Sequence, residues 1–134
     1  GIFLIIKRVS DFVNCTGMIS YFGMRYMKKH NKRKINEKHI EHALKVLSGK
    51  WRLKVLWEVY NYESIRFNQL QKNVEGISSL MLTRVLKDLI DNNLVIRTQF
   101  NEVPPHVEYS LTDLGRSLCP IIRLLEDFGK KTLE

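Results

Sequence analysis

The residues of this sequence that could do chemistry gather between positions 78 and 87. They are three hydroxyl-bearing and two basic side chains, Ser78, Ser79, Thr83, Arg84 and Lys87. If this segment is helical, they lie off its apolar stripe, where a guanidinium and hydroxyl groups can hydrogen-bond to base edges in a major groove and a lysine can contact phosphate. Periodicity alone fits the solvated side of a surface helix equally well.

Other chemistries find less support. His39 and His42 lie three residues apart, but a metal site needs three or four converging ligands. Cys15 and Cys119 form no CxxC pair, and Cys119 is more typical of a small buried apolar residue than of a sensor, so we expect reduced thiols. No nucleophile stands at motif spacing from a base, and no glycine-rich phosphate loop is found. We therefore expect neither an enzyme nor a metal or cofactor site.

The positive charge of the chain is concentrated at its beginning. The formal net charge is +8, and residues 1–35 carry +7 of it, from eight basic side chains and one acidic one. Such a one-sided excess suits a partner that carries phosphates, either nucleic acid or an anionic membrane surface. The basic arm His30–Lys34 could follow a DNA groove or be a solvated linker. We expect a basic extension over 1–35 followed by one domain over 36–134.

The length and hydropathy of the chain also bear on its location. Its 134 residues leave room for one domain, and the longest apolar run, Ile2–Ile6, is far shorter than the roughly 20 residues that cross a bilayer. We expect a soluble, cytoplasmic protein with no membrane partner.

Hydrophobic periodicity and capping residues predict the elements that position the candidate side chains. Helices are expected over 36–47, 51–61, 68–74, 78–92 and 113–129, with Pro120 kinking the last of them. A short extended piece over 65–67 and strands over 94–100 and 106–111 complete the set, and prolines stiffen the tip 101–105. This order predicts an α+β, mostly helical fold: a winged helix-turn-helix with additional N- and C-terminal helices, in which helix 78–92 enters a major groove.

Several blocks of the sequence match one family in order and spacing. They are Ser48-Gly49-Lys50-Trp51, Ile65-Arg66-Phe67-Asn68-Gln69-Leu70, Gly76-Ile77-Ser78, Met81-Leu82-Thr83, Leu86-Lys87-Asp88-Leu89 and residues 103–115. Over residues 36–129 the chain resembles the HxlR-type winged-helix transcription regulators, relatives of the MarR group. The resemblance implies a homodimer, joined through its terminal helices, that binds an inverted-repeat operator in double-stranded DNA. Family habit favours a repressor.

Two positions depart from the family pattern. Many members place a Cys-Pro pair at the start of the first helix, where oxidants or electrophiles are sensed, and this chain has Lys38-His39 there. Sensing through that position is therefore not expected. The residue after the two wing prolines is commonly arginine, and here it is His106, whose neutral imidazole makes a weaker phosphate contact.

The resemblance widens the set of candidate DNA contacts. Side chains at helix starts, along the helix before the reading helix and on the wing would lie near phosphates or a minor groove: Lys50, Arg66, Asn68, Gln69, Lys72, Arg97 and His106. Arg97 and His106, on opposite strands, could clamp a minor groove or its phosphates. Arg66 could instead pair with a carboxylate inside the fold, and His106 with a residue on the opposite strand.

Two alternative functions stay open at this point. A winged helix can serve as a protein-interaction module without operator binding, although Arg84 and Lys87 argue against that use. MarR relatives also bind small aromatic molecules near the dimer helices, so a ligand-responsive regulator with a small-molecule effector is the second alternative. The aromatic residues Trp51, Trp57, Phe67 and Tyr109 are nevertheless spaced as core residues.

Overall fold

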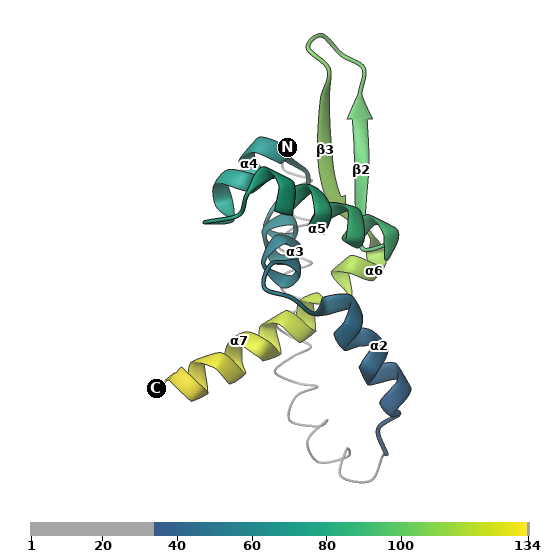
Figure 1. Cartoon of the computed structure of the whole chain (residues 1–134), viewed down its shortest axis with the longest axis vertical. Helices are drawn as coiled ribbons and strands as arrows, with labels where there is room; N and C mark the ends of the chain where they lie inside the picture. Colours follow the sequence, from purple (N-terminus) through teal and green to yellow (C-terminus); the bar gives the residue numbers. More distant parts are fainter. Residues whose placement is uncertain (1–33, 134) are drawn as a thin grey trace, which may run out of the picture. The chain divides into compact units, whose positions relative to one another are not determined.

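The computed structural model describes residues 34–133. In chain order its elements are α2 (Glu37–Leu47), α3 (Arg52–Asn61), β1 (Ile65–Arg66), α4 (Phe67–Asn73), α5 (Ser79–Asp91), β2 (Val95–Phe100), β3 (His106–Leu111), α6 (Asp113–Arg116) and α7 (Cys119–Leu133) (Figure 1). The chain divides into two compact units, one over residues 42–118 and one that includes residues 34–41 and 119–133. Most of the predicted basic extension, with Cys15 and the arm up to Arg33, lies outside the described residues.

The core of the unit over residues 42–118 forms where α3, α4 and α5 turn their apolar stripes inwards. Its largest fully buried side chains are Leu56, Leu70, Leu82, Leu89, Val55 and Val59. In α5 the buried residues recur at intervals of three and four, which is the period of one helix face. Burying each such side chain contributes roughly 1.5–3 kcal/mol before chain entropy is counted. The polar residues of α5 are thereby left on the outer side of the unit.

The α4 and α5 helices form a helix-turn-helix. Between them Gly76 adopts a positive φ of 85°, a conformation that side chains with a Cβ rarely adopt. Ser78 then caps α5, because its Oγ accepts a hydrogen bond from the backbone N–H of Met81 at 3.1 Å. The ring of Trp51 lies against the turn, with its Cη2 atom 3.7 Å from the position that a Cβ on Gly76 would take.

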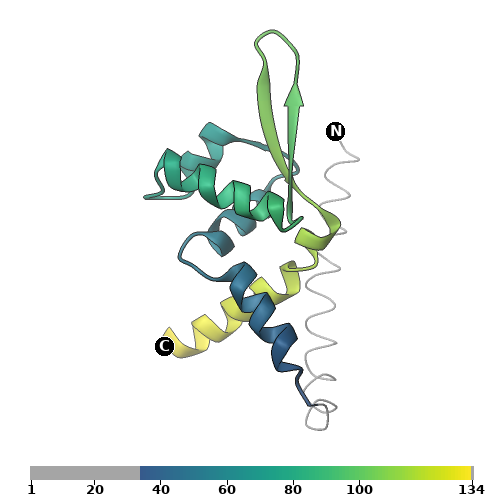
Figure 2. The ribbon, with the colours of Figure 1, turned by 45° about the vertical axis from the view of Figure 1, so that its right-hand side comes forward.

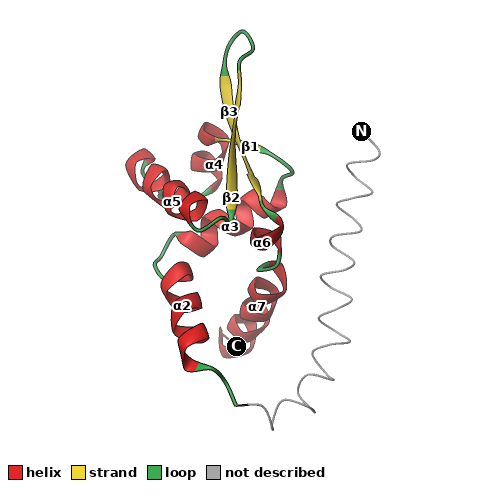
Figure 3. Ribbon diagram, turned by 90° about the vertical axis from the view of Figure 1, so that its right-hand side faces the viewer, coloured by secondary structure: helices red, strands yellow, loops and turns green. Residues whose placement is uncertain are grey.

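The three strands form an antiparallel sheet in the order β1-β3-β2. Figure 3 shows β2 and β3 as a long hairpin with the short β1 beside β3. The pairing runs from Val95 with Leu111, which are buried at the base, to Phe100 with His106 near the tip. From its base the hairpin extends away from α4 and α5, so that its tip is exposed (Figure 2). This is the wing, and the predicted winged helix-turn-helix is confirmed.

The C-terminal region differs from the single kinked helix predicted over 113–129. The structure has two helices there, α6 and α7, with a break at residues 117–118, and α7 continues to Leu133. Pro120 has no N–H and cannot continue the hydrogen bonding of α6, but it is tolerated in the first turn of a new helix. Thr112 begins α6 by accepting a hydrogen bond from the N–H of Gly115 at 2.9 Å. The predicted kink at Pro120 is therefore wrong, because the helix is interrupted before this residue.

The α2 and α7 helices expose apolar side chains. No residue of α2 is buried, and Cys119 is the one buried residue in the described α7. Both helices are amphipathic in sequence, and their exposed apolar residues are Ile40 and Leu44 in α2 and Ile121, Leu124, Leu125, Phe128 and Leu133 in α7. Among the described residues, no helix combines the length and the apolar character that a membrane span requires.

Candidate nucleic-acid interface

The outer face of α5 carries four of the five polar side chains that the sequence singled out between positions 78 and 87. Ser79, Thr83, Arg84 and Lys87 are all exposed there, opposite the buried stripe of the same helix. Neither the side chain of Arg84 nor that of Lys87 has a hydrogen bond or an ion pair to another residue in the range 34–133. Both cationic groups can therefore bind an external partner without breaking an internal contact.

Two hydroxyl groups at the start of α5 already make hydrogen bonds within the helix. Ser78 accepts a hydrogen bond as the helix cap, which leaves its O–H proton to donate. Thr83 donates its proton to the carbonyl oxygen of Ser79 at 2.8 Å, so its Oγ1 can still accept from a base amino group. Ser78 therefore combines a structural role with any DNA contact it makes.

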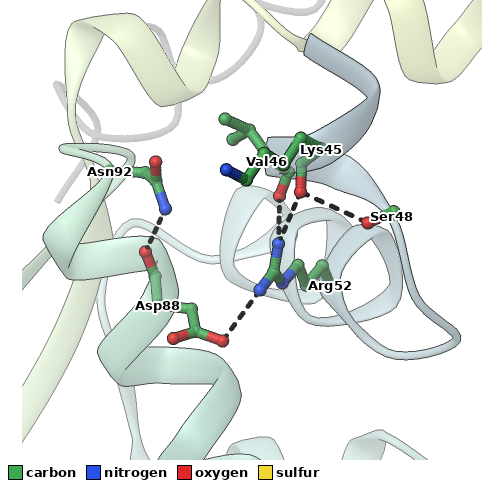
Figure 4. Close-up of polar contacts among 6 residues, drawn as sticks. All are labelled: Lys45, Val46, Ser48, Arg52, Asp88 and Asn92. Carbon is green, nitrogen blue, oxygen red and sulfur yellow. Dashed lines mark hydrogen bonds and ion pairs between the residues drawn. The ribbon is translucent and has the colours of Figure 1, made fainter. Parts of the chain in front are cut away.

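A guanidinium inside the unit fixes α5 to the end of α2 (Figure 4). Arg52 donates from Nη1 to the carbonyl oxygens of Lys45 and Val46 at 2.9 and 2.8 Å, and its Nη2 lies 2.9 Å from Oδ2 of Asp88. The two carbonyls belong to the last turn of α2, where helical hydrogen bonds run out and a positive charge is favourable. The sequence analysis missed Arg52, because its partner Asp88 is 36 residues away in the chain.

Two lysines flank Trp51 beside the turn of the helix-turn-helix. The Nζ atom of Lys50 lies 4.7 Å from the Trp51 ring centroid, and that of Lys54 lies 5.2 Å from it. Cation–π contacts of this kind hold a charged group near a surface without neutralising it. Lys50 was predicted as a phosphate contact, and Lys54 joins it as a candidate that the sequence analysis missed. The sequence signal that could have indicated Lys54 is its spacing of three residues from Trp51, because residues three apart are neighbours on a helix surface.

The polar residues of α4 divide between internal contacts and open surface. Gln69 donates from Nε2 to Oδ1 of Asn73 at 2.7 Å, and Asn73 donates in turn to the Tyr62 hydroxyl at 2.9 Å. Asn68 and Lys72 are exposed and form no side-chain hydrogen bond or ion pair to another described residue. Gln69 therefore helps to position α4 and keeps its Oε1 and one N–H for an external partner, whereas the side chains of Asn68 and Lys72 are fully available.

Arg66 is exposed at the edge of the sheet. It stands directly opposite Glu108 in the pairing of β1 with β3. Glu108 is instead paired with His106, and the structure between residues 34 and 133 contains no ion pair of Arg66. The carboxylate pairing considered for Arg66 is thus not formed.

The two wing residues do not share a face of the hairpin. Arg97 pairs with Tyr109 and His106 with Phe100, and side chains alternate between faces along each strand. A clamp formed by Arg97 and His106 would therefore contact the groove or its phosphates from opposite faces of the hairpin, and it stays a prediction. His106 stacks on Phe100 with ring centroids 4.8 Å apart, and its Nε2 lies 3.3 Å from Oε2 of Glu108. The cross-strand partner considered for His106 is Phe100.

Thiol and metal chemistry have little support in the described part of the chain. Cys119 is buried, with 4% of its surface exposed, as the sequence predicted. His39 and His42 are both exposed on α2. Residues 34–133 hold no group of three or more His, Cys, Asp or Glu side chains that could bind a metal ion.

Comparison with known proteins now decides the family. Residues 46–134, which include the helix-turn-helix and the wing, match the family described as HxlR-like helix-turn-helix. The chain belongs to this HxlR-like family. A relative from Fusobacterium mortiferum named as the regulatory protein MalR is 36% identical over 105 residues, which cover 78% of this chain and 96% of the relative.

Solved structures agree with the HxlR-like assignment. A MarR-family transcriptional regulator from Porphyromonas gingivalis has a TM-score of 0.67 at 39% identity, covering 73% of this chain and 97% of its own. The redox regulator HypR in its oxidized form has a TM-score of 0.64 at 35% identity, covering 69% and 94%. This HxlR-like protein is therefore a DNA-binding helix-turn-helix transcription regulator, and the exposed face of α5 is its candidate reading surface.

Proposed function

We propose that this protein binds an inverted-repeat operator as a homodimer and represses transcription there. The observation that carries the proposal is the outer face of α5, where Arg84 and Lys87 are exposed and free of partners among the described residues. In a helix-turn-helix the second helix lies in the major groove with its first residues at the base edges. Two copies would then read two half-sites about 10 bp, or a multiple, apart.

The roles of the basic side chains follow from their chemistry. Arg84 is assigned to a guanine, because a guanidinium can donate two parallel hydrogen bonds to its O6 and N7 acceptors. Lys87 is assigned to phosphate, since a point charge on a flexible stem positions the protein without reading sequence. Ser78, Ser79 and Thr83 supply hydroxyl contacts near the start of α5.

The remaining contacts are assigned to the DNA backbone. Two of them, Lys50 and Lys54, flank Trp51 beside the turn. Arg66 directly precedes α4, and three more lie on that helix: Asn68, Gln69 and Lys72. Arg97 is the wing contact, because its side chain is exposed, whereas His106 is stacked and paired. Repression would follow if the bound dimer excludes other proteins from the same DNA, and this part of the proposal rests on family habit.

The homodimer is proposed from the apolar side chains that α2 and α7 expose. In α7, Ile121, Leu124, Leu125 and Phe128 follow one another at intervals of three, one and three, so they share one face. Exposed apolar clusters of this kind mark association surfaces, and a second copy would remove the clusters of both helices from water.

The domain boundary near residue 35 is a further part of the proposal. Residues 1–35 would act as a basic arm that strengthens DNA binding at low salt.

Affinity measurements on variants test the assignment of roles. On a site obtained by binding selection, Arg84→Ala should reduce the preference for one base position by about 1–3 kcal/mol. Lys87→Ala should weaken binding to all sequences alike and reduce the slope of log affinity against log salt by about one unit. Lys130→Ala is the matched control, because Lys130 is an exposed basic residue on the side of α7 opposite Phe128 and its neighbours.

The outcomes separate the proposal from its alternatives. An equal loss for Arg84→Ala on every sequence would remove it as the reading residue. Failure of the binding selection to enrich any site would favour a protein-interaction module instead, whereas a selected site that neither variant weakens would remove this face of α5 as the DNA contact. A dependence of operator release on a small aromatic molecule would favour the ligand-responsive alternative.

A further inference from the structure

One exposed residue of the reading helix is apolar. Leu80 lies in the first turn of α5 with 62% of its surface exposed. It is nine residues from the fully buried Leu89, and nine residues are two and a half helical turns, so the two side chains point in opposite directions. Leu80 therefore stands at the centre of the outer face, where the protein core cannot explain it.

The neighbours of Leu80 are the candidate DNA contacts themselves. Thr83 and Arg84 follow it at three and four residues, and Lys87 at seven, so these side chains adjoin it on the same face. No other large apolar side chain of α5 is exposed. The surface is a single apolar spot enclosed by polar and cationic groups, and it sits at the end of the helix that contacts base edges.

The edges of the base pairs in a major groove offer one apolar group, the C5-methyl of thymine. Against a cytosine amino group or a guanine carbonyl, Leu80 would remove a polar group from water without giving it a hydrogen bond, which is unfavourable. Against a thymine methyl it would remove two apolar surfaces from water, which is favourable. The exposed leucine therefore distinguishes thymine from the other three bases by both effects.

We infer that Leu80 determines specificity by packing on the C5-methyl group of a thymine in the half-site. The inference deepens the proposed function and rests on it. Leu80 and Arg84 are separated by about 6 Å along the helix axis, which corresponds to about two base pairs at 3.4 Å each. The thymine thus lies within about two base pairs of the guanine that Arg84 contacts.

Substitution of single methyl groups in the DNA tests the inference directly. Binding selection first supplies an operator for the full chain, and each thymine of one half-site is then replaced in turn by deoxyuridine, which lacks only the methyl group. Affinities are measured for the unmodified protein, for Leu80→Ala, and for Leu80→Met, which keeps an apolar side chain. Leu114→Ala is the matched control, because Leu114 is a similarly exposed leucine on α6.

The expected result is one position at which deoxyuridine weakens binding of the unmodified protein about fourfold, the factor for one methyl-sized group removed from water. Leu80→Ala abolishes that difference at that position, whereas Leu80→Met and Leu114→Ala keep it. Because Leu80 is 62% exposed, its substitution removes little buried surface, and the variants are expected to fold like the unmodified protein.

Two other results overturn the inference in distinguishable ways. If an operator is found but no deoxyuridine effect depends on Leu80, the protein reads DNA without this contact, and the proposed function stands. If no operator is enriched by the full chain, the proposed function fails, and the role of Leu80 fails with it.

Discussion

Removal of the Arg52 guanidinium is expected to destabilise the protein more than its ion pair alone would suggest. The guanidinium makes two hydrogen bonds to carbonyl oxygens of α2 and one to Asp88, whose side chain is 46% exposed. An ion pair with so exposed a partner contributes about 0.2–1 kcal/mol. The two bonds to the α2 carbonyls involve a charged donor with 24% exposure and should contribute about 2 kcal/mol together. Arg52→Ala is therefore expected to lower the free energy of unfolding by about 2–3 kcal/mol.

Comparison with two other variants separates the contributions. Asp88→Asn removes the charge of the partner but leaves the α2 carbonyls capped, so we expect a loss of less than about 1 kcal/mol. Arg52→Lys keeps the charge but lacks the planar guanidinium whose N–H groups reach three oxygens. Its loss of unfolding free energy should therefore lie between those of Arg52→Ala and Asp88→Asn.

Urea unfolding followed by circular dichroism provides the assay. All variants are measured at one protein concentration, because association of copies shifts apparent stability. A loss for Asp88→Asn as large as that for Arg52→Ala would refute the reasoning, since the ion pair would then dominate. A loss below about 0.5 kcal/mol for Arg52→Ala would show that water replaces the guanidinium at the end of α2.

Two further predictions concern packing and association. Gly115→Ala should destabilise the fold by more than about 1 kcal/mol, because a Cβ there would clash with the carbonyl oxygen of Leu94, whereas Gly129→Ala in open space should stabilise α7 by up to about 1 kcal/mol. Thermal unfolding of the two variants checks both signs, and a neutral Gly115→Ala would mean that α6 can move away from Leu94. Phe128→Asp should break the proposed dimer and give a monomer in sedimentation, since Phe128 is 66% exposed among the apolar residues of α7, and Lys130→Asp on the other side of the helix should not. Equal effects of these two substitutions would remove the apolar face of α7 from the dimer contact.

The sequence predicted the elements around the reading helix closely. The spacing of Leu82, Val85 and Leu89 at the helical period predicted α5, and Ser78 caps it. Local signals suffice here, because a helix face and its cap are defined within a few residues of each other.

The features that the sequence did not predict are set by parts of the chain outside the residues concerned. The pairing register of the wing places Arg97 and His106 on opposite faces, and it is set by the turn at residues 101–105 rather than by either residue. The break before Pro120 depends on whether the proline falls in the interior or in the first turn of a helix, which the apolar pattern does not define.

The sequence predicted only part of the candidate site, because some of its residues are brought together by contacts between separate helices. Arg84 and Lys87 were found because polar residues at helical spacing share a face. Leu80 was assigned to neither the apolar stripe nor the polar face, and its position became plain only when its exposure was known. The contact between Arg52 and Asp88 joins residues on separate helices and has no signal in a single sequence.

Binding selection from a random duplex pool at near-physiological salt tests the central claim most directly. The full chain is incubated with the pool, and the bound DNA is recovered and sequenced. The account predicts enrichment of an inverted repeat whose half-sites are centred about 10 bp, or a multiple, apart. Weak, salt-sensitive binding to all sequences with no enriched repeat would contradict it, because α5 would then contact DNA without reading its bases.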